Sequence, residues 1–135
     1  MNYYAVIDTN VLVSSMLKHD SIPGIIVDLC TNGPITPIIN DKIVDEYREV
    51  LTRNKFDFSE EDVDNAINDF ISSAISCDRV DIDEYFKDKG DIVFYEIVMS
   101  SNQYRDTYLV TGNIKHFPIK PFVVTPREML EIINK

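Results

Sequence analysis

The sequence predicts an α/β fold in which helices cover both faces of a central parallel β-sheet, in a three-layer, Rossmann-like arrangement. Three short apolar runs, at 3–8, 107–111 and 121–125, have the composition of strands that are buried on both faces. Between them lie segments whose apolar residues recur at helical spacing. Strands that alternate with helices along a chain favour a parallel sheet with a helix in each crossover.

The predicted elements alternate in the order that this fold requires. Ser59 precedes three acidic residues and Thr125 precedes Pro126, and both patterns are typical of helix starts. The apolar stripe after Ser59 continues at helical spacing to Ala74 and Ile75. The predicted elements are a strand at 3–8, helices at 11–17 and 22–30, a strand at 35–39, helices at 41–51 and 60–75, a short strand at 79–82, a polar loop at 87–90, a helix at 91–101, strands at 107–111 and 121–125, and a helix at 126–134.

The length and composition are those of one soluble domain that spans 1–135. A content of 44% hydrophobic and 27% charged residues is ordinary for a globular protein. No stretch approaches the roughly 20 apolar residues that a membrane-spanning helix needs. The N-terminus lacks the features of a secretion signal, and the two cysteines, Cys30 and Cys77, are not at metal-ligand spacing. We therefore expect a cytoplasmic protein with free thiols and no membrane segment.

The charge balance restricts the kind of nucleic-acid contact that the chain can make. Thirteen basic and 23 acidic residues give a net charge of -10, which opposes non-specific binding to a polyanion. Any role with nucleic acid requires local basic groups, bound cations or a basic partner. The balance therefore argues against a DNA-coating protein, but not against a metal-dependent enzyme.

Several acidic and polar residues fall where strands end or helices begin. Asp8 ends the first predicted strand, the segment 111–113 ends the strand at 107–111, and Asp91 starts a helix. In a parallel sheet these positions share the edge where ligands bind. Glu46 lies on the flank of the helical stripe centred on Tyr47, so its carboxylate can lean over the same edge. Three acids, Asp8, Glu46 and Asp91, can therefore converge.

Three converging carboxylates point to a divalent cation, because like charges held together are costly without one. Oxygen ligands with no cysteine or histidine between them suit Mg²⁺ or Mn²⁺, and such a site hydrolyses phosphodiesters through an activated water. Each residue also has an ordinary interpretation: Asp8 or Asn10 caps a helix, Asp91 or Asp88 caps another, and Asn113 belongs to a turn. Composition and spacing leave both interpretations open.

Four successive segments, VIDTNVLVSSML, VDEYREVL, DIVFYEIV and DTYLVTGNIKHFP, together resemble the motifs of the PIN-domain family. The similarity extends from Tyr4 to about Leu130, and more narrowly resembles the toxin components of bacterial toxin–antitoxin pairs. The resemblance implies a compact α/β/α fold with metal-dependent ribonuclease activity on single-stranded RNA. Position by position, its three acids correspond to Asp8, Glu46 and Asp91.

The chain departs from the resemblance at Asn113, where many family members carry an acid. A neutral amide can still coordinate or orient a water but adds no charge, which implies a weaker second metal site or dependence on one ion. The other candidates are supporting or substrate-contacting residues. Thr9 and Asn10 support the acids and cap the first helix, Thr111 orients water or substrate, and Lys115 and His116 contact phosphate.

The residues and the resemblance together predict a cytoplasmic, Mg²⁺- or Mn²⁺-dependent endoribonuclease. The resemblance further implies products with a 5′-phosphate and a toxin that an antitoxin protein restrains, and a homodimer is left open. One alternative is a catalytically weak or inactive module that binds RNA or a protein partner in the same cleft. Another is a phosphatase with Asp8 as nucleophile, but that chemistry usually needs a second acid where Asn10 stands.

Overall fold

The structure is a computed structural model that describes residues 2–135. Its strands are β1 (Tyr3–Ile7), β2 (Ile35–Ile39), β3 (Ile75–Ser76), β4 (Thr107–Val110) and β5 (Val123–Val124). Its helices are α1 (Thr9–Leu17), α2 (Ile22–Asn32), α3 (Asp41–Leu51), α4 (Glu60–Ile71), α5 (Lys89–Ser101) and α6 (Pro126–Ile133), with short 3₁₀ turns η1 (Asn54–Phe56) and η2 (Ile114–His116). Within the described range, no helix is long and apolar enough to cross a membrane.

The five strands run parallel in one sheet with the order β3-β2-β1-β4-β5. β1 is central, because Ala5 is aligned with Pro37 of β2 on one side and with Tyr108 of β4 on the other. The strand order therefore reverses between β1 and β4. In open parallel sheets the ligand crevice lies beyond the carboxyl ends of the strands at this reversal, which here means beyond Ile7 and Val110.

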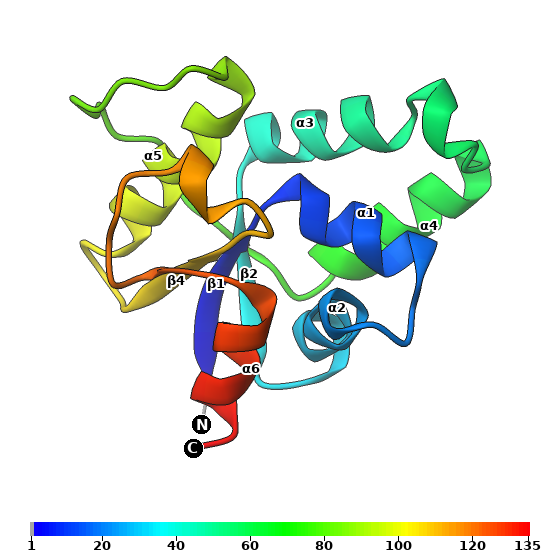
Figure 1. The fold of residues 1–135 in the computed structure, drawn as a ribbon, viewed down its shortest axis with the longest axis horizontal. Coiled ribbons are helices and arrows are strands. Elements are labelled where there is room, and N and C mark those ends of the chain that lie inside the picture. The colour runs from blue at the N-terminus through cyan, green and yellow to red at the C-terminus, as the bar shows by residue number, and fades with distance from the viewer. Residues whose placement is uncertain (1) are drawn as a thin grey trace.

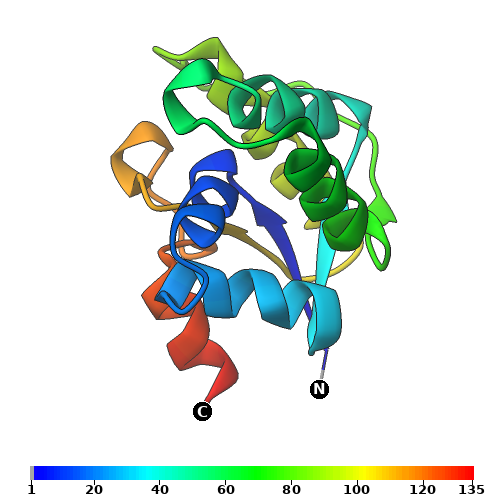
Figure 2. The ribbon, with the colours of Figure 1, turned by 90° about the vertical axis from the view of Figure 1, so that its right-hand side faces the viewer.

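Helices cover both faces of the sheet, which confirms the predicted three-layer α/β/α fold (Figures 1 and 2). α5 packs against β1, β2 and β4 on one face, whereas α2 packs against β2 on the other and contacts α1, α4 and α6. Figure 1 also shows that the end of β1, the start of α3, the start of α5 and the turn η2 gather at one end of the sheet. Both chain ends lie at the opposite end.

A fully buried tyrosine connects the core to the crevice. Tyr47 of α3 packs edge-on against Phe70 of α4, with ring centroids 5.7 Å apart, and lies 6.0 Å from the ring of Phe94 of α5. Its hydroxyl donates a 2.6 Å hydrogen bond to the carbonyl oxygen of Ile7, the last residue of β1. Three helices are thereby held at a fixed distance from the strand end that carries Asp8.

The region between α4 and α5 differs from the prediction. α4 ends at Ile71, so the predicted burial of Ala74 and Ile75 in the same helix is wrong, and the predicted strand at 79–82 is also wrong. The Ser72 hydroxyl donates to the Asp69 carbonyl, 2.7 Å away, and this local bond accompanies the end of the helix. The strand instead forms at Ile75–Ser76, where it pairs with Ile38 and Ile39 of β2.

Several other boundaries move by one or two residues. α1 begins at Thr9 rather than at residue 11, and α5 begins at Lys89 rather than at residue 91. Asp8 and Asp88 are therefore the N-cap residues of these helices. β5 covers only Val123–Val124 of the predicted run at 121–125. The helix caps predicted at Ser59 and Thr125 are confirmed.

Candidate functional site

Asp8 lies at the centre of the crevice, directly after β1, and is only 5% exposed. Its Oδ1 accepts a 2.8 Å hydrogen bond from the backbone N–H of Thr9. Its Oδ2 accepts from the hydroxyl of Thr111 at 2.7 Å and from the side-chain amide of Asn10 at 3.2 Å. The prediction that Asn10 or Thr9 caps α1 is wrong, because Asp8 is itself the cap. Capping and a place in the crevice are therefore compatible roles for one carboxylate.

Burial raises the pKa of the Asp8 carboxyl from its ordinary value of 3.8 to about 6. The hydrogen bond from Thr111 opposes this rise, while the negative charge of Asp91 adds to it. An acid that keeps its proton to such a pH at the edge of a sheet is typical of a functional site rather than of a plain helix cap.

Glu46 reaches the same crevice from α3. Its carboxylate lies so close to the start of α5 that a Cβ added to Gly90 would be 3.0 Å from its Oε1 and 3.3 Å from Oδ1 of Asp88. Burial raises the pKa of Glu46, and the negative charges of Glu49, Asp88 and Asp8 raise it further. A side chain at residue 90 would therefore contact both carboxylates and displace them from their present positions.

Asp91 stands in the first turn of α5, where the helix dipole favours a negative charge. Burial nevertheless raises its pKa, and the neighbouring charge of Asp88 contributes to the rise. Asp88 caps the helix, since its Oδ1 accepts a 2.9 Å hydrogen bond from the N–H of Gly90. Asp91 is therefore left free of the capping role and is oriented by a different partner.

That partner is His116 in the turn η2. Its Nδ1 lies 3.2 Å from Oδ2 of Asp91, and its Nε2 lies 3.1 Å from the side-chain amide nitrogen of Asn113. Asn113 is linked in turn to Asp8, because its backbone N–H donates to the Thr111 hydroxyl at 2.9 Å. One hydrogen-bonded chain thus runs from Asp91 through His116, Asn113 and Thr111 to Asp8.

These residues line a single cleft of about 270 Å³ beyond the carboxyl ends of β1 and β4. We call it the acid cleft; its lining includes Asp8, Thr9, Asn10, Glu46, Asp88, Asp91, Asn113 and His116. Two residues predicted from the sequence lie outside its lining. Thr111 is fully buried beneath it, behind Asp8, and Lys115 lines a neighbouring cavity instead.

Two cations, Arg53 and Lys55, also line the acid cleft. With Arg48 they form a basic group in the sequence, a pattern that is as typical of a solvated helix end as of an RNA contact. Both cations follow the end of α3 at Leu51: Arg53 precedes the turn η1 and Lys55 belongs to it. The guanidinium of Arg53 lies 2.8 Å from a carboxylate oxygen of Glu49 and lowers the pKa of Glu46 through its charge. The cleft therefore carries positive as well as negative groups.

The donor set of the acid cleft fits a hard divalent cation in its chemistry. Carboxylate and amide oxygens are the ligands that Mg²⁺ and Mn²⁺ prefer. The hydroxyl of Thr9, which lines the cleft, is buried without a hydrogen-bond partner in the described part of the chain. Among residues 2–135, however, no three histidine, cysteine or acidic side chains are grouped closely enough to enclose an ion as they stand. Binding a cation would require these side chains to move closer together.

A family model described as the PIN domain matches residues 4–115 of the chain. The match covers Asp8, Glu46, Asp91 and Asn113, and ends one residue before His116. Comparison with curated proteins and with solved structures found no significant match.

Proposed function

The chain belongs to the PIN-domain family, and because members of this family are generally nucleases that use divalent metals, we propose that it is an Mg²⁺- or Mn²⁺-dependent endoribonuclease that cleaves single-stranded RNA. The observation that carries the proposal is the acid cleft. Asp8, Glu46 and Asp91 come from three separate elements and line one hollow at the reversal of strand order.

In this proposal Asp8, Glu46 and Asp91 hold the cation. When bound, the cation supplies positive charge for the phosphate oxygens and lowers the pKa of a coordinated water. Burial is the main cause of the raised pKa of all three carboxyls and repulsion between neighbouring acids adds to it, and the positive charge of a cation would offset both. The cost of gathering these acids is thus offset only in the loaded enzyme, which is the physical reason to expect metal binding.

The other residues of the cleft orient the acids and the substrate. The N–H of Thr9 binds one carboxylate oxygen of Asp8 and the Thr111 hydroxyl binds the other, so these two hydrogen bonds hold the orientation of the carboxylate. His116 holds Asp91 in the same way. Lys55 lines the cleft and supplies a positive charge for the scissile phosphate, which the net charge of -10 of the protein otherwise repels.

The test is cleavage of single-stranded RNA by the purified chain with Mn²⁺, compared with its Asp8→Asn variant. We expect the variant to lose cleavage and Mn²⁺ binding in calorimetry while it keeps its fold. Asp106→Asn is the matched control, because Asp106 is an exposed aspartate outside the cleft, and it should leave both properties unchanged. Undiminished cleavage by Asp8→Asn would show that the site assignment is wrong.

A toxin role restrained by an antitoxin protein is the biological setting that we propose for this activity. Expression of the chain in bacteria should then arrest growth, and Asp8→Asn should relieve the arrest. Normal growth at equal protein levels, together with RNA cleavage in vitro, would contradict the toxin role and leave the nuclease assignment intact.

A second candidate function is a non-catalytic module that binds RNA or a partner through the same cleft. Two observations favour it: Asn113 is neutral, and the acids of the cleft are not grouped closely enough to enclose an ion as they stand in the described residues. Calorimetric titration with Mn²⁺ separates the two functions. Absence of binding at millimolar concentration supports the module, whereas saturable binding that depends on Asp8 and Glu46 supports the enzyme.

A further inference from the structure

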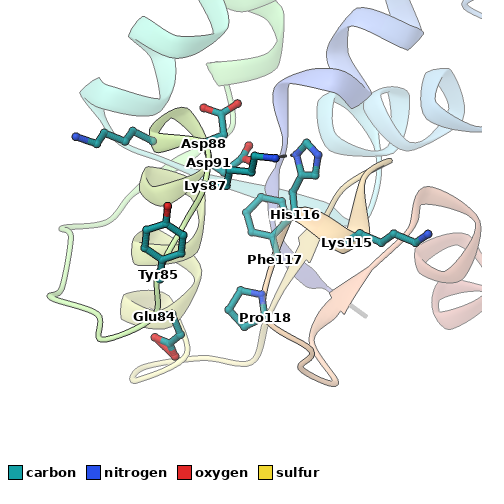
Figure 3. A pocket seen from close by; sticks show the side chains of 10 residues that line it. Glu84, Tyr85, Lys87, Asp88, Asp91, Lys115, His116, Phe117 and Pro118 are labelled. Atoms are coloured by element: carbon teal, nitrogen blue, oxygen red, sulfur yellow. Dashed lines mark ion pairs between the residues drawn. The ribbon is translucent and has the colours of Figure 1, made fainter.

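A larger cavity of about 870 Å³ opens beside the acid cleft and shares Asp88, Asp91 and His116 with it. We call it the flanking cavity, and its other walls include Glu84, Tyr85, Lys87, Lys115, Phe117 and Pro118 (Figure 3). Its volume is within the roughly 300–1,000 Å³ that is typical of ligand sites. A substrate whose phosphodiester lies in the acid cleft therefore has room for its adjoining part in the flanking cavity.

The flanking cavity presents an exposed aromatic ring. Tyr85 is 89% exposed, the highest exposure among the large aromatic side chains that the structure describes. Figure 3 shows Glu84 and Tyr85 on one wall, and Phe117 and Pro118 on the opposite wall. An aromatic ring that is open to solvent beside an apolar surface is a platform on which a base can stack.

The wall that carries Tyr85 is held in place although it belongs to a segment without regular structure. The ring of Phe86 packs at 5.4 Å from Tyr95 of α5 and at 5.9 Å from Phe117. The Tyr95 hydroxyl also donates a 3.3 Å hydrogen bond to Glu84. Residues on both sides of Tyr85 are thus anchored, which fixes the backbone at Tyr85 beside the cavity while its ring stays open to solvent.

The flanking cavity carries three lysines as well as three acids, Glu84, Asp88 and Asp91. Lys87, Lys89 and Lys115 line it, and within residues 2–135 none of them forms an ion pair with an acid. In the view of Figure 3, Lys87 extends toward the side that carries His116, while Lys115 points outward at the rim. Unpaired lysines beside an aromatic ring are typical of surfaces that bind single-stranded nucleic acid.

We propose that the flanking cavity binds one nucleotide of single-stranded RNA next to the scissile phosphate, with its base stacked on Tyr85 and its phosphate contacted by Lys87. Lys115 at the rim lies where the neighbouring phosphate leaves the cavity. This inference rests on the proposed ribonuclease function and adds to it a nucleotide subsite outside the acid cleft.

The test measures binding of a short fluorescent oligoadenylate in the Asp8→Asn background, where the chain does not cleave it. Tyr85→Ala should weaken binding by about 5- to 150-fold, the usual effect of losing one stacked base, and Tyr85→Trp should restore it. An abasic oligomer of the same length should bind Tyr85→Ala and its parent equally. Tyr104→Ala is the matched control, because Tyr104 is 75% exposed but lies outside the flanking cavity.

The phosphate contact is tested by salt titration. Lys87→Ala should reduce the slope of log affinity against log salt by about 0.7, the change expected for one phosphate contact of a single strand. Tyr85→Ala should leave this slope unchanged, and so should the control Lys135→Ala at the opposite end of the sheet.

The inference is overturned if Tyr85→Ala binds oligoadenylate as tightly as its parent, or if it weakens the abasic oligomer equally. It is also overturned if Lys87→Ala leaves the salt slope unchanged. In both cases RNA cleavage by the wild-type chain would keep the proposed function intact. If the wild-type chain neither binds nor cleaves RNA, the proposed function itself fails and the nucleotide subsite fails with it.

Discussion

Replacing Asp8 with asparagine should abolish activity and at the same time make the metal-free protein relatively more stable at neutral pH. The pKa of Asp8 rises from 3.8 to about 6 on folding, chiefly through burial. Because the folded protein holds this proton to a higher pH than the unfolded chain does, stability falls as the pH rises through this interval. Below this pH interval burial of Asp8 costs the folded protein nothing, because Asp8 is protonated; above it the folded protein bears the full cost of the buried charge.

The magnitude follows from the pKa values. Each pKa unit corresponds to about 1.36 kcal/mol, so a rise from 3.8 to about 6 disfavours the charged folded state by about 3 kcal/mol. Asparagine cannot ionise, so it avoids this penalty. It also disturbs the hydrogen bonds from Thr9 and Thr111, but that loss is similar at every pH and cancels in a comparison between two pH values.

The assay is urea unfolding of both proteins with EDTA, at about pH 4 and about pH 7.5. The free energy of unfolding of Asp8→Asn, relative to wild type, should increase by about 2–3 kcal/mol from the lower to the higher pH. Asp106→Asn should show no such change. A relative stability of Asp8→Asn that is the same at both pH values would refute the claim that Asp8 is held in a costly, desolvated state.

Three further substitutions test the positioning of the site. Tyr47→Phe leaves the buried carbonyl of Ile7 without its hydrogen bond, so we expect a loss of about 1–3 kcal/mol in urea unfolding, and an unchanged midpoint would contradict it. Gly90→Ala places a methyl group 3.0 Å from the Glu46 carboxylate, so Mn²⁺ binding in calorimetry should weaken, whereas wild-type affinity would show that binding does not depend on the present position of this carboxylate. Asn113→Asp adds a negative charge to the cleft and should tighten Mn²⁺ binding; weaker binding would place residue 113 outside the coordination sphere.

Features that depend on neighbouring residues could be predicted from the sequence. The cap at Thr125 is one, because its hydroxyl accepts from the N–H of Glu128 at 3.1 Å and the carboxylate of Glu128 accepts from the N–H of Thr125 at 2.9 Å. The parallel sheet is another, since fully buried strands show as short apolar runs. Once the sheet is parallel, Asp8 and Asn113 must share an edge, because each follows the carboxyl end of a strand.

The place of the edge strand β3 could not be predicted. Apolar residues after Ile71 continue at helical spacing, so the pattern alone extends α4 to Ile75. The strand forms there because β2 offers an open edge: Ile75 pairs with Ile38, and the N–H of Cys77 donates to the carbonyl of Ile39 at 2.9 Å. Pairing with a strand that is distant in sequence depends on the tertiary structure, and the local residue propensities do not predict it.

The candidate site likewise has features that neighbouring residues determine and features that depend on the tertiary structure. The kinds of side chain and the edge of the sheet on which they stand follow from the order of residues, since strand ends and helix starts are local features. The raised pKa of Asp8 does not, because it requires burial and the charge of Asp91, 83 positions away in the chain. Nor does the hydrogen bond to Asp8 from Thr111, a residue 103 positions away. Desolvation and electrostatic coupling depend on distances in space, and only the folded chain sets those distances.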